Sequence, residues 1–291
     1  MSKLPTDISA ALIEEINRTR GTSFRIARTG LEGESGATRI ILDPSGRALL
    51  LKWGAGDEFL LDNAIAITGE LSRRGYPLST YLLTGSDAGL RWSIRAMIPG
   101  RAMGGVLDAR YSARVLALNE MQTGAGASLS GDWPARLVES VLKGFQEWCV
   151  LDTLRTYSAE TAAMLSQAQD HARAAEGLRF ELRDAVHFDF NPQNILVESG
   201  EVTAVIDWEG CRAGDRAFDL ATLLFYSYDQ PETRVRLWER MREIAVARAS
   251  ALYLSHMIVR QVDWSIRRHP APAAEQYLGI ARHILRDLRA G

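Results

Sequence analysis

Residues 186–196 read VHFDFNPQNIL and place His, Asp and two Asn between two apolar runs, which is more polar chemistry than a turn requires. Asp189 is followed five positions later by Asn194, and Asp207 follows thirteen positions after that. The runs NILVE and VTAVID, joined by Ser199-Gly200, predict a β-hairpin. Because the strands of a hairpin lie side by side, we expect Asn194 and Asp207 to face one another at its mouth.

These residue types indicate a particular chemistry. Carboxylate and amide oxygens are hard ligands that suit Mg²⁺, so Asn194 and Asp207 are candidate metal ligands. Asp189, on the loop before the hairpin, can accept a proton from a substrate hydroxyl. A single Asp or Asn in such a place is usually a turn or cap residue. The combined pattern His-x-Asp-x4-Asn, then an apolar run and Ile-Asp, favours a functional site.

The elements that must position these residues fall into a β-rich front and a helical back, separated by Pro99-Gly100. In the front we expect helices at 8–18 and 58–74 and strands at 24–30, 37–43, 47–53, 79–84 and 91–97. In the back we expect helices at 109–122, 134–150, 159–175, 216–228, 231–249, 251–267 and 273–289. A cleft between two such lobes is the usual place for a small-molecule site.

Composition limits the possible partners and location. The chain has 291 residues, a net charge of −2 and a pI near 6.2, which give no nucleic-acid signature. The N-terminus has no signal-peptide core, and no apolar stretch approaches the ~20 residues that a membrane span needs. We therefore expect a cytoplasmic protein without a membrane partner, either a monomer or a homodimer. Cys149 and Cys211 are expected to be reduced thiols, with a disulfide as the alternative.

The segment VHFDFNPQNILVESGEVTAVIDWEG resembles the catalytic and metal-binding segments of the aminoglycoside phosphotransferase-like kinases. This superfamily includes choline-kinase-like and other small-molecule kinases and is related to the protein kinases. Downstream, GDRAFDLATLL resembles the Gly-Asp-Pro-x-x-Asp-Leu-Ala segment of the family. The resemblance implies an α+β, protein-kinase-like fold with a β-rich N-lobe over residues 1–98 and a mainly helical C-lobe over residues 99–291. It also implies ATP or GTP, Mg²⁺ and a small-molecule hydroxyl substrate.

Carried over residue by residue, the resemblance makes Asp189 the catalytic base or hydroxyl-orienting carboxylate. It makes Asn194 and Asp207 the ligands that hold Mg²⁺ against the nucleotide phosphates. Glu209, in an Asp-Trp-Glu arrangement, would assist a second metal ion. His187 would orient the loop through hydrogen bonds rather than carry a proton.

The front half supplies the expected nucleotide site. LEGESGATRIIL resembles the family's nucleotide loop, in which glycines let backbone N–H groups approach phosphates; the candidate residues are Gly33, Ser35 and Gly36. Lys52 lies in LLLKW and is costly to bury without a partner, and the α and β phosphates are its natural partners. Lysine is otherwise rare here, since the only others are Lys3 and Lys143. WSIRAMIPG resembles the segment that contacts adenine through its backbone, with Ala96 and Ile98 as the contacting positions.

Three features depart from the family pattern. Phe188 follows the loop His where the family usually has Gly, and Asn191 stands where a basic residue or His is common. The acid that pairs with the lysine falls at Ala64 in our alignment, so Asp62 is the expected partner, with Glu58 and Glu70 as alternatives. Asp219, in the downstream segment, is expected to tie the catalytic loop or its helix.

The acceptor pocket is expected among helices within 134–175 and 231–289. The acids that would favour a polycationic aminoglycoside are scattered: Asp132, Asp152, Glu160, Asp229 and Asp263. Arg260, Arg267 and Arg268 argue against a strongly cationic substrate. Three functions remain open: a kinase that inactivates an antibiotic such as an aminoglycoside, macrolide or cyclic peptide, a metabolic kinase for choline, a sugar or homoserine, and a silent nucleotide-binding module.

Overall fold

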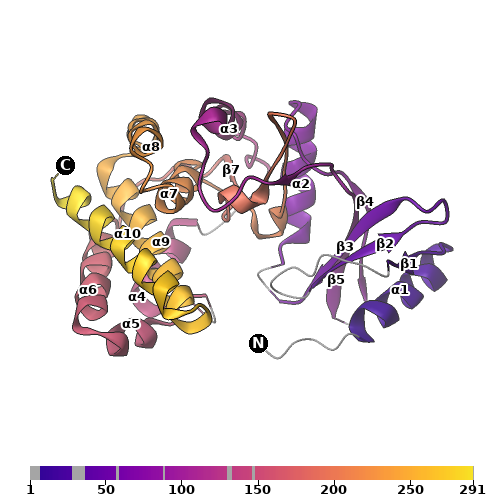
Figure 1. Ribbon diagram of the computed structural model, residues 1–291, viewed down its shortest axis with the longest axis horizontal. Coiled ribbons are helices and arrows are strands. Elements are labelled where there is room, and N and C mark those ends of the chain that lie inside the picture. The colour runs from indigo at the N-terminus through magenta and orange to yellow at the C-terminus, as the bar shows by residue number, and fades with distance from the viewer. Residues whose placement is uncertain are drawn as a thin grey trace.

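The computed structural model describes residues 7–27, 37–56, 59–87, 89–129, 133–145 and 148–290. Its front half contains α1 (Asp7–Arg20), β1 (Arg25–Ile26), β2 (Thr38–Leu42), β3 (Ala48–Gly54), α2 (Leu61–Arg73), β4 (Tyr81–Asp87) and β5 (Leu90–Ala96). The strands form a five-stranded antiparallel sheet in the order β1-β2-β3-β5-β4. The sheet and α1 lie at one end of the elongated molecule and the helices at the other (Figure 1).

The sheet has two different faces because side chains alternate along a strand. In β3, Leu49, Leu51 and Trp53 are buried and pack in one apolar cluster with residues of α1. Lys52 lies between two of these positions in the sequence and therefore points to the opposite face of the sheet. The alternation of β3 thus directs the ammonium group away from the apolar cluster.

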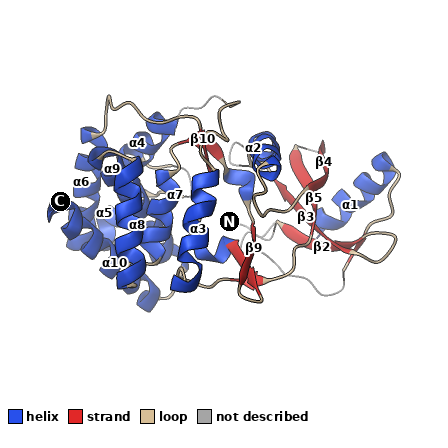
Figure 2. Cartoon of the chain, turned by 90° about the horizontal axis from the view of Figure 1, so that it is seen from above, coloured by secondary structure: helices blue, strands red, loops and turns tan. Residues whose placement is uncertain are grey.

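The back half is mainly helical (Figure 2). Its elements are β6 (Arg101–Ala102), α3 (Ala109–Met121), α4 (Trp133–Lys143), α5 (Leu151–Tyr157), α6 (Ala159–Ala174), β7 (Asp184–Val186), η1 (Pro192–Asn194), β8 (Ile195–Glu198), β9 (Glu201–Val205), η2 (Trp208–Gly210), β10 (Arg212–Gly214), α7 (Ala217–Tyr226), α8 (Pro231–Ile244), α9 (Ala247–Arg268) and α10 (Ala271–Ala290). The architecture confirms the expected α+β class, with a sheet in front and helices behind.

The predicted hairpin is present as β8 and β9. Its two-residue turn has Ser199 at φ 51° and Gly200 at φ 88°, the left-handed conformation that such turns require. Val205 N donates to Pro77 O at 2.9 Å, and β6 pairs with β8. The hairpin is therefore tied to the front half of the chain as well as to the helices.

Helix α2 packs with the helical half. Its buried residues Ala64, Ile67 and Leu71 belong to the large apolar cluster of the back half, not to the cluster of α1 and the sheet. Leu60 N also donates to Glu209 O at 2.7 Å. The division of the chain after residue 98 stays a prediction, since α2 joins the core of the part that follows it.

Two predicted helices are wrong in their bounds. The helix expected over 134–150 ends at Lys143, because Gly144 has φ 86° and a Cβ there would lie 2.7 Å from Cys149 O. The helix expected over 231–249 ends at Ile244, and an extended backbone at Ala245 and Val246 separates α8 from α9. Of the strand expected over 24–30, the structure has Arg25–Ile26, and residues 28–30 lie outside the described ranges.

Two expectations about the whole chain can be compared with the structure. Cys149 and Cys211 are buried free thiols, as expected. Within the described ranges, every helix is too short or too polar to cross a membrane.

Candidate active site

The loop after β7 holds Asp189 in a constrained backbone. Phe188, the residue before it, has φ 73°, a left-handed conformation that favours glycine. This explains why the family pattern has Gly at this place. The Phe188 ring stacks on Phe218 at 5.3 Å between centroids and contacts Trp133 edge-on at 6.0 Å. Aromatic packing therefore offsets the strained backbone beside the candidate catalytic carboxylate.

His187 braces the loop against the second strand of the hairpin. Its side chain is fully buried, and Nε2 donates to Ile206 O at 2.7 Å, while Nδ1 accepts from Asp189 N at 3.3 Å. These partners assign the neutral tautomer with the proton on Nε2. Burial lowers the pKa of His187, which keeps the ring neutral. The contacts are those of an orienting residue, as the sequence suggested.

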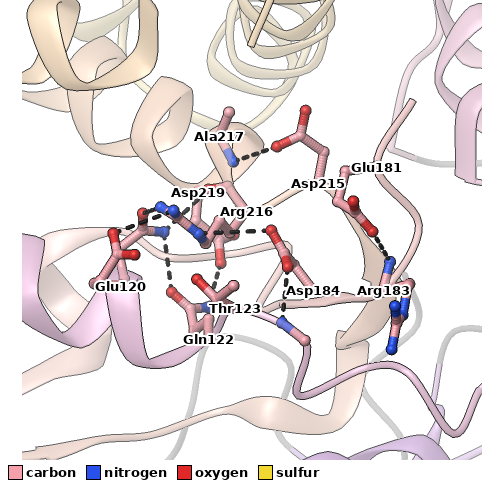
Figure 3. A network of polar contacts seen from close by, with 12 residues as sticks. Glu120, Gln122, Thr123, Glu181, Arg183, Asp184, Asp215, Arg216, Ala217 and Asp219 are labelled. Carbon is pink, nitrogen blue, oxygen red and sulfur yellow. Dashed lines mark hydrogen bonds and ion pairs between the residues drawn. The ribbon is translucent and has the colours of Figure 1, made fainter. Parts of the chain in front are cut away.

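Asp219 ties the loop from behind. Its carboxylate accepts from His187 N at 2.8 Å, Phe188 N at 3.1 Å and Gln122 Nε2 at 2.7 Å. Figure 3 shows this carboxylate beside Gln122. Asp219 therefore ties the loop that carries Asp189, as expected.

Arg216 extends the same network toward α3 and β7. Its guanidinium lies between Glu120, at 3.1 Å, and Asp184, at 3.6 Å (Figure 3). Its Nη1 also donates to Asn119 Oδ1 at 3.1 Å. The segment that resembles the family's Gly-Asp-Pro motif thus anchors β7, the strand that leads into the loop carrying Asp189.

Asn194 links Asp189 to the hairpin. Asn191 caps the short helix η1 by accepting from Gln193 N and Asn194 N, which fixes where Asn194 lies. Asn194 Nδ2 donates to Asp189 O at 2.9 Å and to Asp189 Oδ2 at 3.1 Å, and its backbone O accepts from Ile206 N at 2.9 Å. Its side-chain oxygen is the atom that remains to bind a metal ion.

Lys52 reaches across from the sheet to the end of the hairpin. Its Nζ lies 2.7 Å from Asp207 Oδ1 and 3.2 Å from Glu209 Oε2. Burial alone would lower the pKa of Lys52, but the charges of Glu209 and Asp207 outweigh it and raise that pKa. Burial likewise opposes the ionised carboxylates, yet Arg95 and Lys52 lower the pKa of Glu209, and Lys52 lowers that of Asp207. The side chains of Lys52, Arg95, Asp207 and Glu209 are therefore all charged near neutral pH.

The expected pairing of Lys52 with Asp62 is wrong. Asp62 lies on an exposed face of α2, with 77% of its side chain accessible, and binds Arg91 at 2.5 Å. Of the two alternatives, Glu70 pairs with Arg73 and Arg74, and Glu58 lies outside the described residues. The lysine is held instead by Glu209 and by Asp207, which is also a candidate metal ligand.

Two arginines complete the site. Arg95 is buried in β5 and pairs with Glu209 at 2.9 Å. Arg95 was not among the residues predicted for the site, although an arginine inside the apolar run WSIRAM carries the same signal as Lys52. Arg260, from α9, donates to Phe188 O at 3.1 Å and to Asp189 Oδ1 at 3.2 Å, and only 13% of its side chain is exposed. Arg260 therefore fixes the candidate catalytic carboxylate from the side opposite Asn194.

Two cavities meet at this carboxylate. The first, of about 440 Å³, is lined by Lys52, Asp189, Asn194 and Asp207 and extends to aromatic residues of α7, α9 and α10. The second, of about 410 Å³, runs between the end of β3 and helices α4 and α9, and Glu209 lines it. Their shared walls are Lys52, Trp148, Asp189, Asp207 and Arg260. Asp189 is therefore exposed to both cavities.

The adenine contacts and the glycine loop remain predictions. Ala96 lies at the end of β5, where its carbonyl accepts from Ser79 Oγ at 2.5 Å, and neither it nor Ile98 is among the lining residues of the two cavities. Gly33, Ser35 and Gly36 lie outside the described residues.

The donor set fits Mg²⁺ shared with phosphates. Among the described residues, no group of three or more His, Cys, Asp or Glu side chains could hold a metal ion by itself. Mg²⁺ bound to nucleotides typically takes one or two protein carboxylates, with phosphates and waters as its remaining ligands. The carboxylate of Asp207 and the free amide oxygen of Asn194 match that requirement, because both residues line the cavity beside Lys52.

Comparisons with known proteins identify the family and the fold. A family model for the phosphotransferase enzyme family matches residues 32–252. The thermostable mutant of aminoglycoside phosphotransferase APH(4)-Ia, solved with AMP-PNP and hygromycin B, superimposes with a TM-score of 0.70 at 21% identity, covering 98% of this chain and 100% of that one. An aminoglycoside phosphotransferase from Alicyclobacillus acidocaldarius gives a TM-score of 0.62 at 15% identity and covers 94% of each chain.

A curated relative, hygromycin-B 4-O-kinase from Escherichia coli, is 41% identical over 46 residues. That stretch is 16% of this chain and 14% of the relative. The chain belongs to the phosphotransferase enzyme family, because the family model matches most of its length. Membership of this family confirms the expected enzyme class, a phosphotransferase. The solved phosphotransferase structures confirm the expected protein-kinase-like fold.

Proposed function

We propose that the protein transfers the γ-phosphoryl group of ATP to a hydroxyl of an antibiotic and thereby confers resistance. The observation that carries the proposal is the convergence of four residues on one cavity: Lys52 from a strand of the front half, and Asp189, Asn194 and Asp207 from the loop and hairpin of the back half. Burying charged side chains costs free energy of desolvation, so gathering these residues at a cavity wall favours a functional role over a structural one. Because ATP and Mg²⁺ are abundant inside cells, we place the activity in the cytoplasm.

Asp189 orients and deprotonates the acceptor hydroxyl. The acceptor oxygen forms a bond to the γ-phosphorus, the bond from that phosphorus to the β,γ-bridging oxygen breaks, and the nucleoside diphosphate leaves with its electron pair. The hydroxyl proton passes to Asp189. Arg260 and Asn194 each hold one oxygen of that carboxylate, so its direction is fixed before the acceptor binds.

The phosphates need positive charge from both sides. Lys52 is placed to bind them, and Asp207 and Asn194 would hold Mg²⁺, which neutralises charge on the β and γ phosphates when it is bound. Glu209 keeps Lys52 and Arg95 paired, and a contact to a second metal ion stays part of the proposal. Most of the catalysis is therefore positioning and electrostatics, since phosphoryl transfer asks little covalent chemistry of the protein.

The test is acceptor-dependent phosphoryl transfer with purified protein. Mg²⁺-ATP, and separately Mg²⁺-GTP, are incubated with single hydroxylated antibiotics, and products are identified by a mass increase of one phosphoryl group. Expression in a sensitive host must then raise the inhibitory concentration of the same antibiotic. Transfer to choline, sugars or homoserine without any resistance would make the protein a metabolic kinase. Nucleotide binding without transfer to any hydroxyl compound would make it a silent module.

A further inference from the structure

The acidic groups that the structure describes in the walls around Asp189 are all paired with basic groups. Among the described residues that line the two cavities, the acids are Asp189, Asp207 and Glu209. Each already has a basic partner, namely Arg260, Lys52 and the pair Lys52 and Arg95 respectively. All three also belong to the proposed phosphoryl-transfer apparatus, so none remains for recognition of a cationic acceptor.

The nearby acid Asp263 is also unable to reach an acceptor. Its side chain is fully buried, Oδ1 accepts from Arg267 Nε at 2.8 Å, and Oδ2 accepts from Arg267 Nη2 at 2.7 Å and from Val150 N at 2.9 Å. Asp263 therefore holds Val150, the residue before α5, against helix α9. An acid that was a sequence candidate for binding a polycation is therefore structural.

The same walls are rich in aromatic rings and guanidinium groups. Trp148 and Trp264 stack with centroids 5.1 Å apart and planes inclined by 14°, and Trp148 is 37% exposed. The Arg260 guanidinium lies 5.9 Å from the Trp148 ring, and that of Arg268, which is not among the lining residues, lies 5.3 Å from the Trp264 ring. Arg136 lines the second cavity, as Trp148 does, and its guanidinium lies 4.2 Å from the Phe145 ring. An ammonium group entering here would find no unpaired acid among the described wall residues, and guanidinium groups already lie over both tryptophan rings, whereas a flat or apolar ring would meet a matching surface.

One polar group in the second cavity is available to accept a hydrogen bond from a ligand. Ser140 Oγ donates to Leu137 O at 2.8 Å and lies 2.7 Å from His256 Nδ1. Since the hydroxyl has one proton, both bonds are satisfied when Nδ1 carries the ring proton. His256 Nε2, buried and without a hydrogen-bond partner among the described residues, is then a lone-pair acceptor in a wall of the cavity.

We propose that the acceptor is a hydroxylated compound without net positive charge, and that it presents a planar or apolar ring to the Trp148–Trp264 pair. The proposal rests on the proposed phosphotransferase function and narrows its substrate class away from polycationic aminoglycosides. In it, Trp264 is a specificity-determining residue and does not act on the reacting atoms.

The experiment compares acceptors that differ in one property. Kanamycin is compared with its per-N-acetylated derivative, which keeps the hydroxyls and loses the positive charges. 4-Nitrophenyl β-glucoside is compared with methyl β-glucoside, which lacks the aromatic ring. We expect kcat/KM for nucleotide consumption to be at least about tenfold higher for the uncharged member and for the aromatic member.

Variants assign the effect to the tryptophan pair. Trp264→Leu is expected to reduce the aromatic advantage to about twofold or less and to leave the KM for ATP unchanged. Trp238→Leu, the same substitution on α8 outside the cavity walls, is expected to keep the advantage. If Trp264→Leu kept the full preference for the aromatic glucoside, the proposed stacking of the acceptor ring on the Trp148–Trp264 pair would be wrong.

The remaining outcomes separate this inference from the proposed function. Kanamycin used as well as, or better than, its acetylated derivative would overturn the inference while the phosphotransferase function stood. Nucleotide binding with no consumption above the acceptor-free rate for any of the four acceptors, and for a panel of neutral macrocyclic alcohols, would overturn the proposed function and this inference with it.

Discussion

Glu209→Gln is the substitution whose cost follows most directly from the structure. The Glu209 side chain is 5% exposed and lies 2.9 Å from Arg95 and 3.2 Å from Lys52, whose side chains are 3% and 14% exposed. Glutamine has the same shape and keeps one hydrogen-bond acceptor, but it removes the negative charge. Asp207 would remain as the only acid bound to Lys52 among the described residues, and Arg95 would lose its only described carboxylate partner.

The magnitude follows from the burial of Arg95. Removing one partner of a buried ion pair costs about 3–5 kcal/mol, because the remaining charge stays buried and uncompensated. An unfolding entropy of about 2.1 cal/mol/K per residue gives about 0.6 kcal/mol/K for a chain of this length. We therefore expect the melting temperature to fall by about 5–8 °C.

The assay is urea denaturation and thermal melting beside a matched control. Glu70→Gln makes the same substitution at an acid that also contacts two arginines, Arg73 and Arg74, but on the surface. It is expected to cost less than about 1 kcal/mol. The double variant Arg95→Met with Glu209→Gln is expected to recover part of the loss. A Glu209→Gln protein within about 1 kcal/mol of the wild type would refute the buried-charge reasoning.

Three further predictions concern the loop and its neighbours. Burial, with Arg260 and Arg136 nearby, lowers the pKa of His256 to about 3. Between about pH 6 and 4 the unfolded state therefore binds a proton that the folded state does not. As the pH decreases through this range, the free energy of unfolding falls by up to about 1.4 kcal/mol per pH unit. Urea titrations of His256→Asn should lose this contribution to the pH dependence. Phe188→Ala should be less stable to urea than Phe188→Gly by about 1 kcal/mol, because alanine keeps the left-handed strain. Arg260→Gln should lower kcat about tenfold or more in steady-state assays, with the KM for ATP within about twofold, because Asp189 loses its guanidinium partner.

Each of these has a contradicting result. An unchanged pH slope in His256→Asn would mean that the histidine is not held neutral. Equal stability of the two Phe188 variants would mean that the left-handed backbone carries no strain. For Arg260, a full recovery by Arg260→Lys would show that charge alone suffices, whereas the geometry requires two nitrogens, one for Phe188 O and one for Asp189.

Local patterns predicted the groups that lie close together in sequence. His187, Asp189 and Asn194 share one loop, and the hairpin that brings Asp207 beside them is a short-range structure with a clear turn signal. Lys52 was predictable because a lysine in an apolar strand requires a partner. Strand alternation then determines which face of the sheet it occupies.

The partners of Lys52 were not predictable in the same way. Asp62 has a reasonable position in the sequence, but α2 turns its apolar side into the core of the helical half and leaves Asp62 exposed beside Arg91. The rotation of a helix against its neighbours depends on packing that spacing alone does not contain. Arg260 lies 71 residues from Asp189, so only the docking of α9 on the loop shows that contact.

Asp189→Asn tests the central claim most directly. The variant keeps the size of the side chain and its bond to Arg260 but cannot take the hydroxyl proton. With an acceptor that the wild type phosphorylates, kcat for Mg²⁺-dependent transfer should fall by a factor of about 10²–10⁴, while the KM for ATP and the melting temperature stay close to those of the wild type. Full turnover by Asp189→Asn would contradict the assignment of this carboxylate to the acceptor hydroxyl and, with it, the mechanism.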